Sequence, residues 1–400
     1  MDFTPTETEQ EIARLAVRVL QGARPVNVGV PVPATDRPAT DRPAMDGPAA
    51  DGSATGGPFT GGLAAGPGET YDRALWKELS QAGLLSLALP GWLDGDGLGV
   101  AGAAVLLTEI GRRGAAVPAL ATVMTGVLPV IRWGERGLQQ TLLAGVATGD
   151  TVLTAALREP SDPMPARPAT TATLAGGTGR AGSASTVSGL KVGVPYCAEA
   201  SWVLVPASIA GDGSAVVIVN PAADGVTVMR THSSGGEPEY TLRLSAAPVT
   251  GVLTEEGVSD LYRLALAGAC CLADGAVSAA LALTTGHIGT REQFGRPLAT
   301  FQATAQHIAD VYIVARTLHL ATLSACWRLA EGQDAGPDID VAAYWMAAYA
   351  PAVLRVCHHL HGGTGMDASY PLPRFSALIK DLVRYTGGTG YRLDQLGARV

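Results

Sequence analysis

The sequence predicts an α+β, multidomain fold with an N-terminal helical domain, a middle antiparallel β domain and a C-terminal four-helix bundle. Three textures along the chain support this prediction. Helical periodicity dominates residues 1–149, short Val-, Thr- and Leu-rich runs fill residues 150–253, and long helical patterns occupy residues 254–400. With 400 residues, 47% of them hydrophobic, the chain can bury the cores of two or three such domains.

The N-terminal domain begins with a helix, because apolar residues recur at helical spacing from Thr6 to Leu20 behind Thr and Glu residues that suit a helix start. Residues 22–70 contain the near-repeat PATDRPATDRPAMDGPAADG and then Gly-rich sequence, with almost nothing to bury. We expect a flexible insertion there, since such a composition cannot offset the entropy of ordering. The helical pattern resumes at Tyr71 and pauses at residues 90–99.

The middle domain is predicted from the runs TVLTAAL, WVLVPA, AVVIVN, GVTVMR and EYTLRL, which lie between Gly, Pro, Asp and Ser clusters. Such regular spacing is typical of an antiparallel sheet or barrel. Beyond it, long helices are predicted at residues 257–289, 298–331 and 338–360, followed by shorter ones. Their short connections imply antiparallel neighbours, and hence a bundle.

The charge pattern excludes several classes of partner. The formal net charge is −8 and no stretch gathers Lys and Arg on one periodic face, so the sequence predicts binding to neither nucleic acid nor membrane. An acidic, amphipathic N-terminus and the lack of an uncharged apolar run long enough for a bilayer indicate a cytoplasmic protein. Five cysteines without CxxC spacing favour buried free thiols. We expect small molecules and proteins as partners.

Glycine motifs are prominent but do not form a standard nucleotide loop. Gly177, Gly179 and Gly182 match GxGxxG, yet a loop and a strand follow instead of the helix that a dinucleotide site needs. The tetrapeptide GGTG occurs at residues 176–179, 362–365 and 387–390. None of the three is followed by Lys-Ser or Lys-Thr, which excludes a P-loop.

A cluster of metal-ligating residue types precedes the second GGTG, at Cys357, His358, His359 and His361. Adjacent residues on a helix diverge by about a hundred degrees, so the neighbouring histidines cannot easily converge on one ion, and we predict no metal site. Instead, HHLHGGTG is expected to end a long helix and expose backbone amides that a ligand can approach closely.

Two stretches resemble the acyl-CoA dehydrogenases. TREQFGRPLATFQATAQHIAD, residues 290–310, is similar to the RxxFG…FQ segment of that family, and HLHGGTGMDASYPLPR, residues 359–374, to its QxxGGxG…YPxxR segment. LWKELSQAGLLSLALP, LREPSD and GEPEYTLRL resemble a helix, the "TEP" loop and a late strand of the family. The resemblance covers all but residues 22–70, and the family's α, β, α domain order agrees with the periodicity.

The resemblance implies FAD as cofactor, α,β-dehydrogenation of an acyl-CoA and an oligomer with each flavin at a subunit interface. Arg291 matches the arginine that pairs with the FAD pyrophosphate of a neighbouring subunit, for which a guanidinium fork is suited. His359 stands at the family's Gln. The residues matching the adenosine end are Gln293, Phe294, Leu298 and Gln302, and the glycines that admit the cofactor against bare backbone are Gly362, Gly363 and Gly365.

The catalytic base of the family has no counterpart here. The reaction needs a carboxylate for the α proton while the β hydrogen leaves as hydride to the flavin. In most members that Glu lies in a YEGT-like segment, whose Glu aligns with Gly387. A minority place it on the first bundle helix, in the region of Leu264–Leu266, and no acid lies there either. We therefore assign no catalytic residue to this chain.

The β domain has also lost residues that serve the flavin ring. The family's KxWIT segment corresponds to Lys191–Pro195, with Gly193 for the Trp and Pro195 for the hydroxyl residue, and Arg158 replaces the Thr of the TEP motif. Residues matching the adenosine and pyrophosphate end are thus retained while those for the ring are depleted. The chain is similar to the base-lacking subunits of bacterial heteromeric acyl-CoA dehydrogenases that act on bulky, steroid-like CoA thioesters.

That similarity implies a second acyl-CoA dehydrogenase-like subunit that carries the catalytic Glu, with Arg291 completing its flavin site, and an electron-transfer flavoprotein as possible acceptor. Two alternatives stay open: a self-sufficient FAD-dependent enzyme of secondary metabolism with a non-standard base, and a non-catalytic structural subunit. Four other acids are available as a base: Glu159, Glu199, Glu237 and Asp274. We interpret the first three as solvated loop charges and Asp274 as a helix-interior polar contact.

Overall fold

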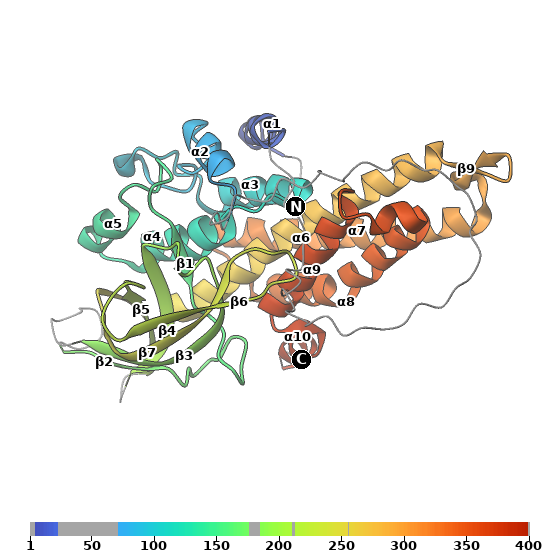
Figure 1. Ribbon diagram of the computed structural model, residues 1–400. Coiled ribbons are helices and arrows are strands. Elements are labelled where there is room, and N and C mark those ends of the chain that lie inside the picture. Colours follow the sequence, from blue (N-terminus) through green and yellow to red (C-terminus); the bar gives the residue numbers. More distant parts are fainter. Residues whose placement is uncertain (1–4, 23–70, 176–184, 210–212, 255, 399–400) are drawn as a thin grey trace, which may run out of the picture.

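The computed structural model describes residues 5–22, 71–175, 185–209, 213–254 and 256–398, and it has the predicted order of helical domain, β domain and helical bundle (Figure 1). The expected flexible insertion lies outside the described residues except for Gly22, and so does the GxGxxG match at Gly177. All five cysteines are free and buried, as predicted.

The N-terminal domain is helical and begins with α1 (Glu7–Leu20), whose start is fixed by a capping box. Thr6 Oγ1 accepts the amide N–H of Glu9 at 3.2 Å, and the Glu9 carboxylate accepts the amide N–H of Thr6 at 2.7 Å. The later elements are α2 (Arg73–Gln81), η1 (Gly91–Leu93), α3 (Gly99–Arg113), the π-helix η2 (Leu120–Val127), α4 (Leu128–Trp133) and α5 (Arg136–Leu143).

The β domain is an eight-stranded sheet in the order β6-β7-β3-β2-β4-β5-β8, with β1 paired to β4. Most pairs are antiparallel, as predicted, but β1 and β2 each run parallel to β4. The strands are β1 (Leu153–Ala155), β2 (Thr171–Thr173), β3 (Thr186–Pro195), β4 (Trp202–Ile209), β5 (Gly213–Val219), β6 (Val226–Thr231), β7 (Glu239–Pro248) and β8 (Gly251–Leu253).

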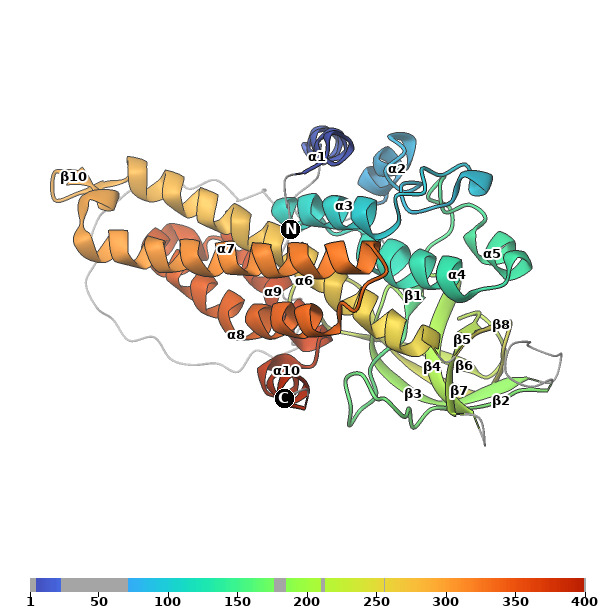
Figure 2. The ribbon, with the colours of Figure 1, turned by 180° about the vertical axis from the view of Figure 1, so that it is seen from behind.

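The bundle consists of long antiparallel helices that extend away from the sheet (Figures 1 and 2). The three long helices were predicted to within a few residues, although the second, predicted from residue 298, starts at Gln302 because a hairpin and a 3-10 turn precede it. The elements are α6 (Glu256–Thr290), β9 (Glu292–Gln293), β10 (Arg296–Pro297), η3 (Leu298–Thr300), α7 (Gln302–Ala330), α8 (Gly336–His361), η4 (Gly362–Met366), α9 (Leu372–Tyr385) and α10 (Gly388–Gly397).

Helix α6 lies at the centre of the molecule. Among the described helices it alone is long and apolar enough to cross a membrane, but 83% of its most apolar window is buried inside the chain, as expected of a core helix. It crosses α3 at very close range, because a Cβ on Gly275 would strike the carbonyl oxygen of Thr108 and a Cβ on Gly111 that of Leu272. This crossing brings the end of α3 close to the sheet and α9, where Ile110 of α3 lines one cavity with Gly193 of β3 and Arg384 of α9.

Candidate active site and cofactor end

The segment expected to face a flavin ring, Lys191–Pro195, forms the end of β3. Gly193 has φ +65°, and a Cβ built there would lie 2.9 Å from Arg158 Nη1 and 3.1 Å from Glu239 Oε1. Charged side chains therefore occupy the space that the Trp of the KxWIT pattern would take. Nε of Arg158 is buried and has no hydrogen-bond partner within the described chain.

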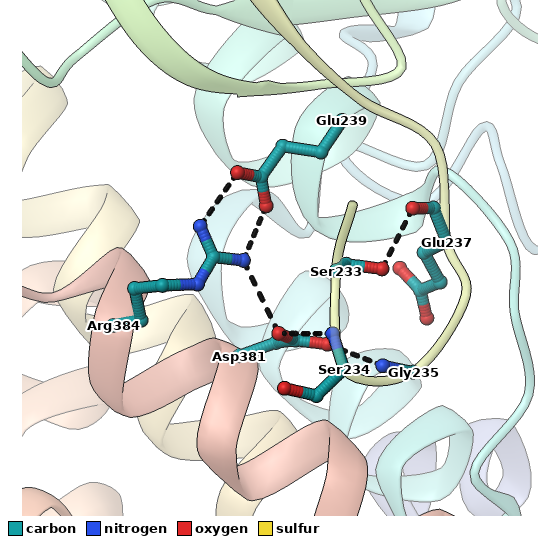
Figure 3. Close-up of polar contacts among 7 residues, drawn as sticks. All are labelled: Ser233, Ser234, Gly235, Glu237, Glu239, Asp381 and Arg384. Atoms are coloured by element: carbon teal, nitrogen blue, oxygen red, sulfur yellow. Dashed lines mark hydrogen bonds and ion pairs between the residues drawn. The ribbon is translucent and has the colours of Figure 1, made fainter. Parts of the chain in front are cut away.

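Glu239 at the start of β7 and the preceding β6–β7 loop, residues 232–238, are fastened to α9 through Arg384 and Asp381 (Figure 3). Both terminal nitrogens of Arg384 contact the carboxylate of Glu239, and Nη2 also lies 3.1 Å from Asp381 Oδ1. The Asp381 carboxylate in turn accepts the amide N–H groups of Ser234 and Gly235, at 2.8 and 2.7 Å. We refer to Arg158, Glu239, Asp381 and Arg384 as the ring-side cluster.

A cavity of about 100 Å³ remains beside the ring-side cluster. Apolar side chains from α3, η2, α6 and α9 line most of it, and Glu237 lines one wall. The hydroxyl of Tyr196 donates to Glu237 Oε2 at 2.8 Å, and burial raises the pKa of Glu237 to about 7. Pockets that hold drug-sized ligands measure roughly 300–1,000 Å³, so this cavity is too small for an acyl-CoA.

Neither position expected for the base offers space for a carboxylate. Gly387 has φ +95°, and a Cβ there would lie 2.7 Å from Cδ1 of Tyr391 and 2.8 Å from Cγ of Pro163. The alternative region, Leu264–Leu266, is buried in the apolar core. A glutamate at either place would require its neighbours to move.

The other acids differ in part from their interpretation as solvated charges. Glu159 is only 5% exposed and bonds to Lys191 Nζ at 2.9 Å and to the amides of Ala169 and Thr170, so that interpretation was wrong. The feature of the sequence that could have revealed this buried ion pair was Lys191, the Lys of the KxWIT pattern. The interpretation was also wrong for Glu237, which lines the cavity and accepts from Tyr196, and for Glu199, which accepts from the Tyr240 hydroxyl at 2.7 Å. Asp274 is held, as predicted, by a polar contact inside the helices, with His319 Nδ1 at 2.9 Å.

Arg291 and the residues that follow it lie at the end of the bundle remote from the sheet, on the hairpin labelled β9 and β10 (Figures 1 and 2). Arg291, Gln293, Phe294 and Gln302 are exposed, and Leu298 in η3 is half-buried. Phe294 is 92% exposed although it adopts φ +55°. An exposed aromatic in a left-handed conformation does not serve the core of its own chain.

The second glycine motif comes to the same bundle end. The ring of His287, one turn before Arg291 on α6, stacks on His361 at the end of α8 with centroids 4.4 Å apart, and His307 on α7 contacts His359 at 5.8 Å. His287 was not identified from the sequence, although its spacing of four residues from Arg291 places both at one helix end. We call the Arg291–Gln302 segment together with the His359–Gly365 loop the cofactor end.

The glycine loop leaves space around its backbone, as the sequence predicts. Gly362 has φ +59°, and a Cβ on Gly362 or Gly363 would meet no atom within 4 Å in the described chain. Gly365 differs, because a Cβ there would lie 2.8 Å from that of His361. The bare backbone at the first two positions fits the approach of another molecule, such as the diphosphate of FAD.

Comparison with known proteins agrees with this arrangement. Residues 66–150 match the acyl-CoA dehydrogenase N-terminal domain and residues 260–400 the C-terminal domain. Acyl-CoA dehydrogenase FadE28 of Mycobacterium tuberculosis is 45% identical over 81% of this chain and 91% of its own length.

Two solved structures are similar over nearly the whole chain. The ChsE4-ChsE5 complex from Mycobacterium tuberculosis is 28% identical with a TM-score of 0.82, covering 100% of this chain and 98% of that one. A variant of the Tcur3481-Tcur3483 steroid acyl-CoA dehydrogenase is 29% identical with a TM-score of 0.81, covering 98% and 97%.

Helical domain, sheet and bundle in this order define a flavoprotein dehydrogenase fold. The chain belongs to the acyl-CoA dehydrogenase family, whose members are FAD-dependent oxidoreductases that act on acyl-CoA. The predicted fold class, family and cofactor are thereby confirmed.

Proposed function

We propose that this chain is one subunit of a heteromeric acyl-CoA dehydrogenase, in which it binds the adenosine and diphosphate end of an FAD whose ring and catalytic Glu belong to a partner subunit. Two similar structures, a ChsE4-ChsE5 complex and a steroid acyl-CoA dehydrogenase, support a second dehydrogenase-like chain and a bulky, steroid-like acyl-CoA. An electron-transfer flavoprotein is the acceptor we propose, and the cytoplasm the compartment.

The observation that carries the proposal is the filled ring side. A Trp at position 193 would require Arg158 and Glu239 to move, because their side-chain ends lie 2.9 and 3.1 Å from the Cβ position of Gly193. Gly387 is closed off by Tyr391 and Pro163. Together with a cavity of only about 100 Å³, these contacts support a chain that houses neither ring nor substrate of its own.

The distance between the two regions supports sharing across an interface. Leu272 of α6 lines the same cavity as Gly193, and Arg291 directly follows the last residue of α6, 291 − 272 = 19 residues further on. At 1.5 Å per residue, these positions are separated by about 28 Å along the axis. The cofactor end therefore faces away from the chain's own ring side, towards a neighbouring subunit.

The residues of the cofactor end have defined roles in this proposal. FAD, when bound, supplies the acceptor for the hydride that leaves the acyl chain. Arg291 would pair with the diphosphate, and the amide N–H groups of the Gly362–Gly365 loop would donate to it at close range. Gln293, Phe294, Leu298, Gln302 and His359 would surround the adenosine.

The test is flavin retention by the complex of this chain with a co-expressed dehydrogenase-like chain that has an intact Glu. Arg291→Ala should lower retained FAD at least tenfold, because a bidentate charged contact to phosphate is lost. Arg243→Ala is a matched control, since Arg243 is exposed on β7, away from the cofactor end. Unchanged FAD content in Arg291→Ala would refute the assignment and favour a structural subunit.

One observation favours the self-sufficient enzyme as a second candidate. Glu237 lies in the cavity beside Tyr196 with a pKa of about 7, a value suited to a general base at neutral pH. The visible spectrum of the chain expressed alone distinguishes the two. A flavin spectrum at one FAD per chain would support this candidate, whereas a colourless protein supports the heteromeric subunit.

A further inference from the structure

The stacked histidines at the cofactor end have properties that a packing role does not explain. His361 is the last residue of α8 and is 5% exposed, and its ring lies against that of His287 at an interplanar angle of 22°. The amide N–H of Arg291 donates to the carbonyl of His287 at 2.8 Å. The stack therefore joins the residue before the glycine loop to the helix end that carries Arg291.

The hydrogen bonding of His361 leaves one of its nitrogens without a partner. Nδ1 lies 2.8 Å from the carbonyl oxygen of Cys357, which can only accept, so Nδ1 carries the proton in this assignment and Nε2 has a free lone pair. Nε2 is buried, and nothing in the described chain donates to it. A buried acceptor without a donor is costly, and a protonated Nε2 would in turn need an acceptor, which an anionic ligand beside the loop can supply.

Burial and neighbouring positive charge disfavour a proton on His287 in the free chain. Burial lowers the pKa of His287, and the charge of Arg291, with that of His361 when it is protonated, lowers it further. Other titratable groups near the ends of the elements that meet there include Glu292 after α6, His307 and Asp310 on α7, Cys357, His358 and His359 on α8, Asp367 and Tyr370 before α9, and Lys380 on α9. Asp367 is already bonded to Ser369, and His358 to Ser376.

We propose that His287 and His361 are positioning residues for the FAD diphosphate, and that their stack takes up a proton when the diphosphate binds at Arg291 and the glycine loop. This inference rests on the proposed function. Negative charge at Arg291 offsets the repulsion that disfavours a proton on His287, and the diphosphate supplies an acceptor for a protonated ring nitrogen of the stack. Because the stack bridges both halves of the cofactor end, the same event fixes Arg291 relative to the loop.

Proton uptake gives FAD binding a definite pH dependence. The pKa of His287 lies below its ordinary value in the free chain, and binding of the diphosphate would raise the pKa of His287. By linkage, FAD affinity is then greatest below the free pKa and falls as pH rises through the bound pKa, by at most about tenfold per pH unit. A contact made by Arg291 alone would show no such slope near neutrality.

The experiment is titration calorimetry of the FAD-depleted complex with FAD at pH 7, in two buffers of different ionisation enthalpy. We expect the wild-type complex to take up a substantial fraction of one proton. His287→Phe and His361→Phe keep an aromatic ring in the stack and should bind FAD more weakly, without proton uptake. The control is His232→Phe, which changes an exposed histidine of the β6–β7 loop and should behave as wild type.

The outcomes separate this inference from the proposed function. Absence of proton uptake by the wild-type complex overturns the inference, even if a Phe variant fails to assemble. Uptake that persists in both Phe variants overturns it as well. If instead Arg291→Ala retains FAD, the proposed function itself fails. Loss of FAD in Arg291→Ala together with no wild-type uptake refutes only the role of the histidines.

Discussion

Where the β domain meets α9, charged side chains pair with one another and leave a small cavity, whereas at the far end of the bundle Arg291 and Phe294 extend into solvent. The first region matches the family's flavin-ring segment in sequence, and the second matches its diphosphate segment. Charged side chains of the first pair with one another, whereas Arg291 and Phe294 of the second are exposed. In the proposed function, the second region serves a neighbouring subunit while the first holds no flavin ring of its own.

The ring side itself contains retained and lost residues. Lys191 and Glu159 stand at family positions and bond to each other in the interior, with side chains 0% and 4% exposed. Gly193 and Arg158, close to them in sequence, differ from the Trp and Thr of the KxWIT and TEP patterns. The two positions that match the patterns form a buried ion pair, which gives them a role in folding whether or not this chain binds a flavin ring.

Breaking the Lys191–Glu159 pair should have the largest effect on stability. Lys191→Met leaves a buried carboxylate without its cation and should lower the free energy of unfolding by about 3–5 kcal/mol, because an uncompensated charge remains in the interior. Urea denaturation measures the loss. The matched control is the double variant Lys191→Met with Glu159→Gln, which should recover part of it. A loss below about 1 kcal/mol in the single variant would show that the pair is not structural.

The fold could be predicted from the sequence because it depends on periodicity, which is local. The helices near residues 257–289 and 338–360 were found in this way, and Arg291 and the glycine loop by their motifs. The ring-side cluster was not predictable, since Arg158 and Arg384 are 384 − 158 = 226 residues apart and only the packing of α9 on the sheet brings them together. The burial of Glu159 was missed for the same reason.

Glu237, which lies beside the ring-side cluster, should make the free energy of unfolding depend on pH. Its pKa is raised from 4.5 to about 7 by burial, so the folded chain binds more protons than the unfolded chain between these values. Stability should therefore fall as pH rises from 4.5 to 7, by at most about 3 kcal/mol. Unfolding measured at pH 5 and 7.5 checks this, and Glu237→Gln should weaken the dependence. An equal dependence in the Gln variant would exclude Glu237 as its source.

The smallest effect is expected at Phe294, and its comparison with Gly193 tests the contrast between the two regions directly. Both have positive φ, at +55° and +65°, but Phe294 is 92% exposed while the Cβ position of Gly193 meets Arg158 and Glu239. Phe294→Ala keeps a Cβ in the same conformation and should change the free energy of unfolding by less than about 0.5 kcal/mol. Gly193→Ala adds a Cβ to a left-handed position and should cost about 1–2 kcal/mol.

Binding to the partner should reverse that order. Phe294→Ala should weaken assembly with the dehydrogenase-like partner or lower the FAD content of the complex. An exposed aromatic side chain whose loss does not destabilise its own chain is available for a contact with another molecule. Gly193→Ala should leave the FAD content of the assembled complex unchanged, since the ring side holds no cofactor in this proposal. If Gly193→Ala lowered FAD content and Phe294→Ala did not, the two regions would have the opposite roles, and the flavin would belong to this chain's own β domain.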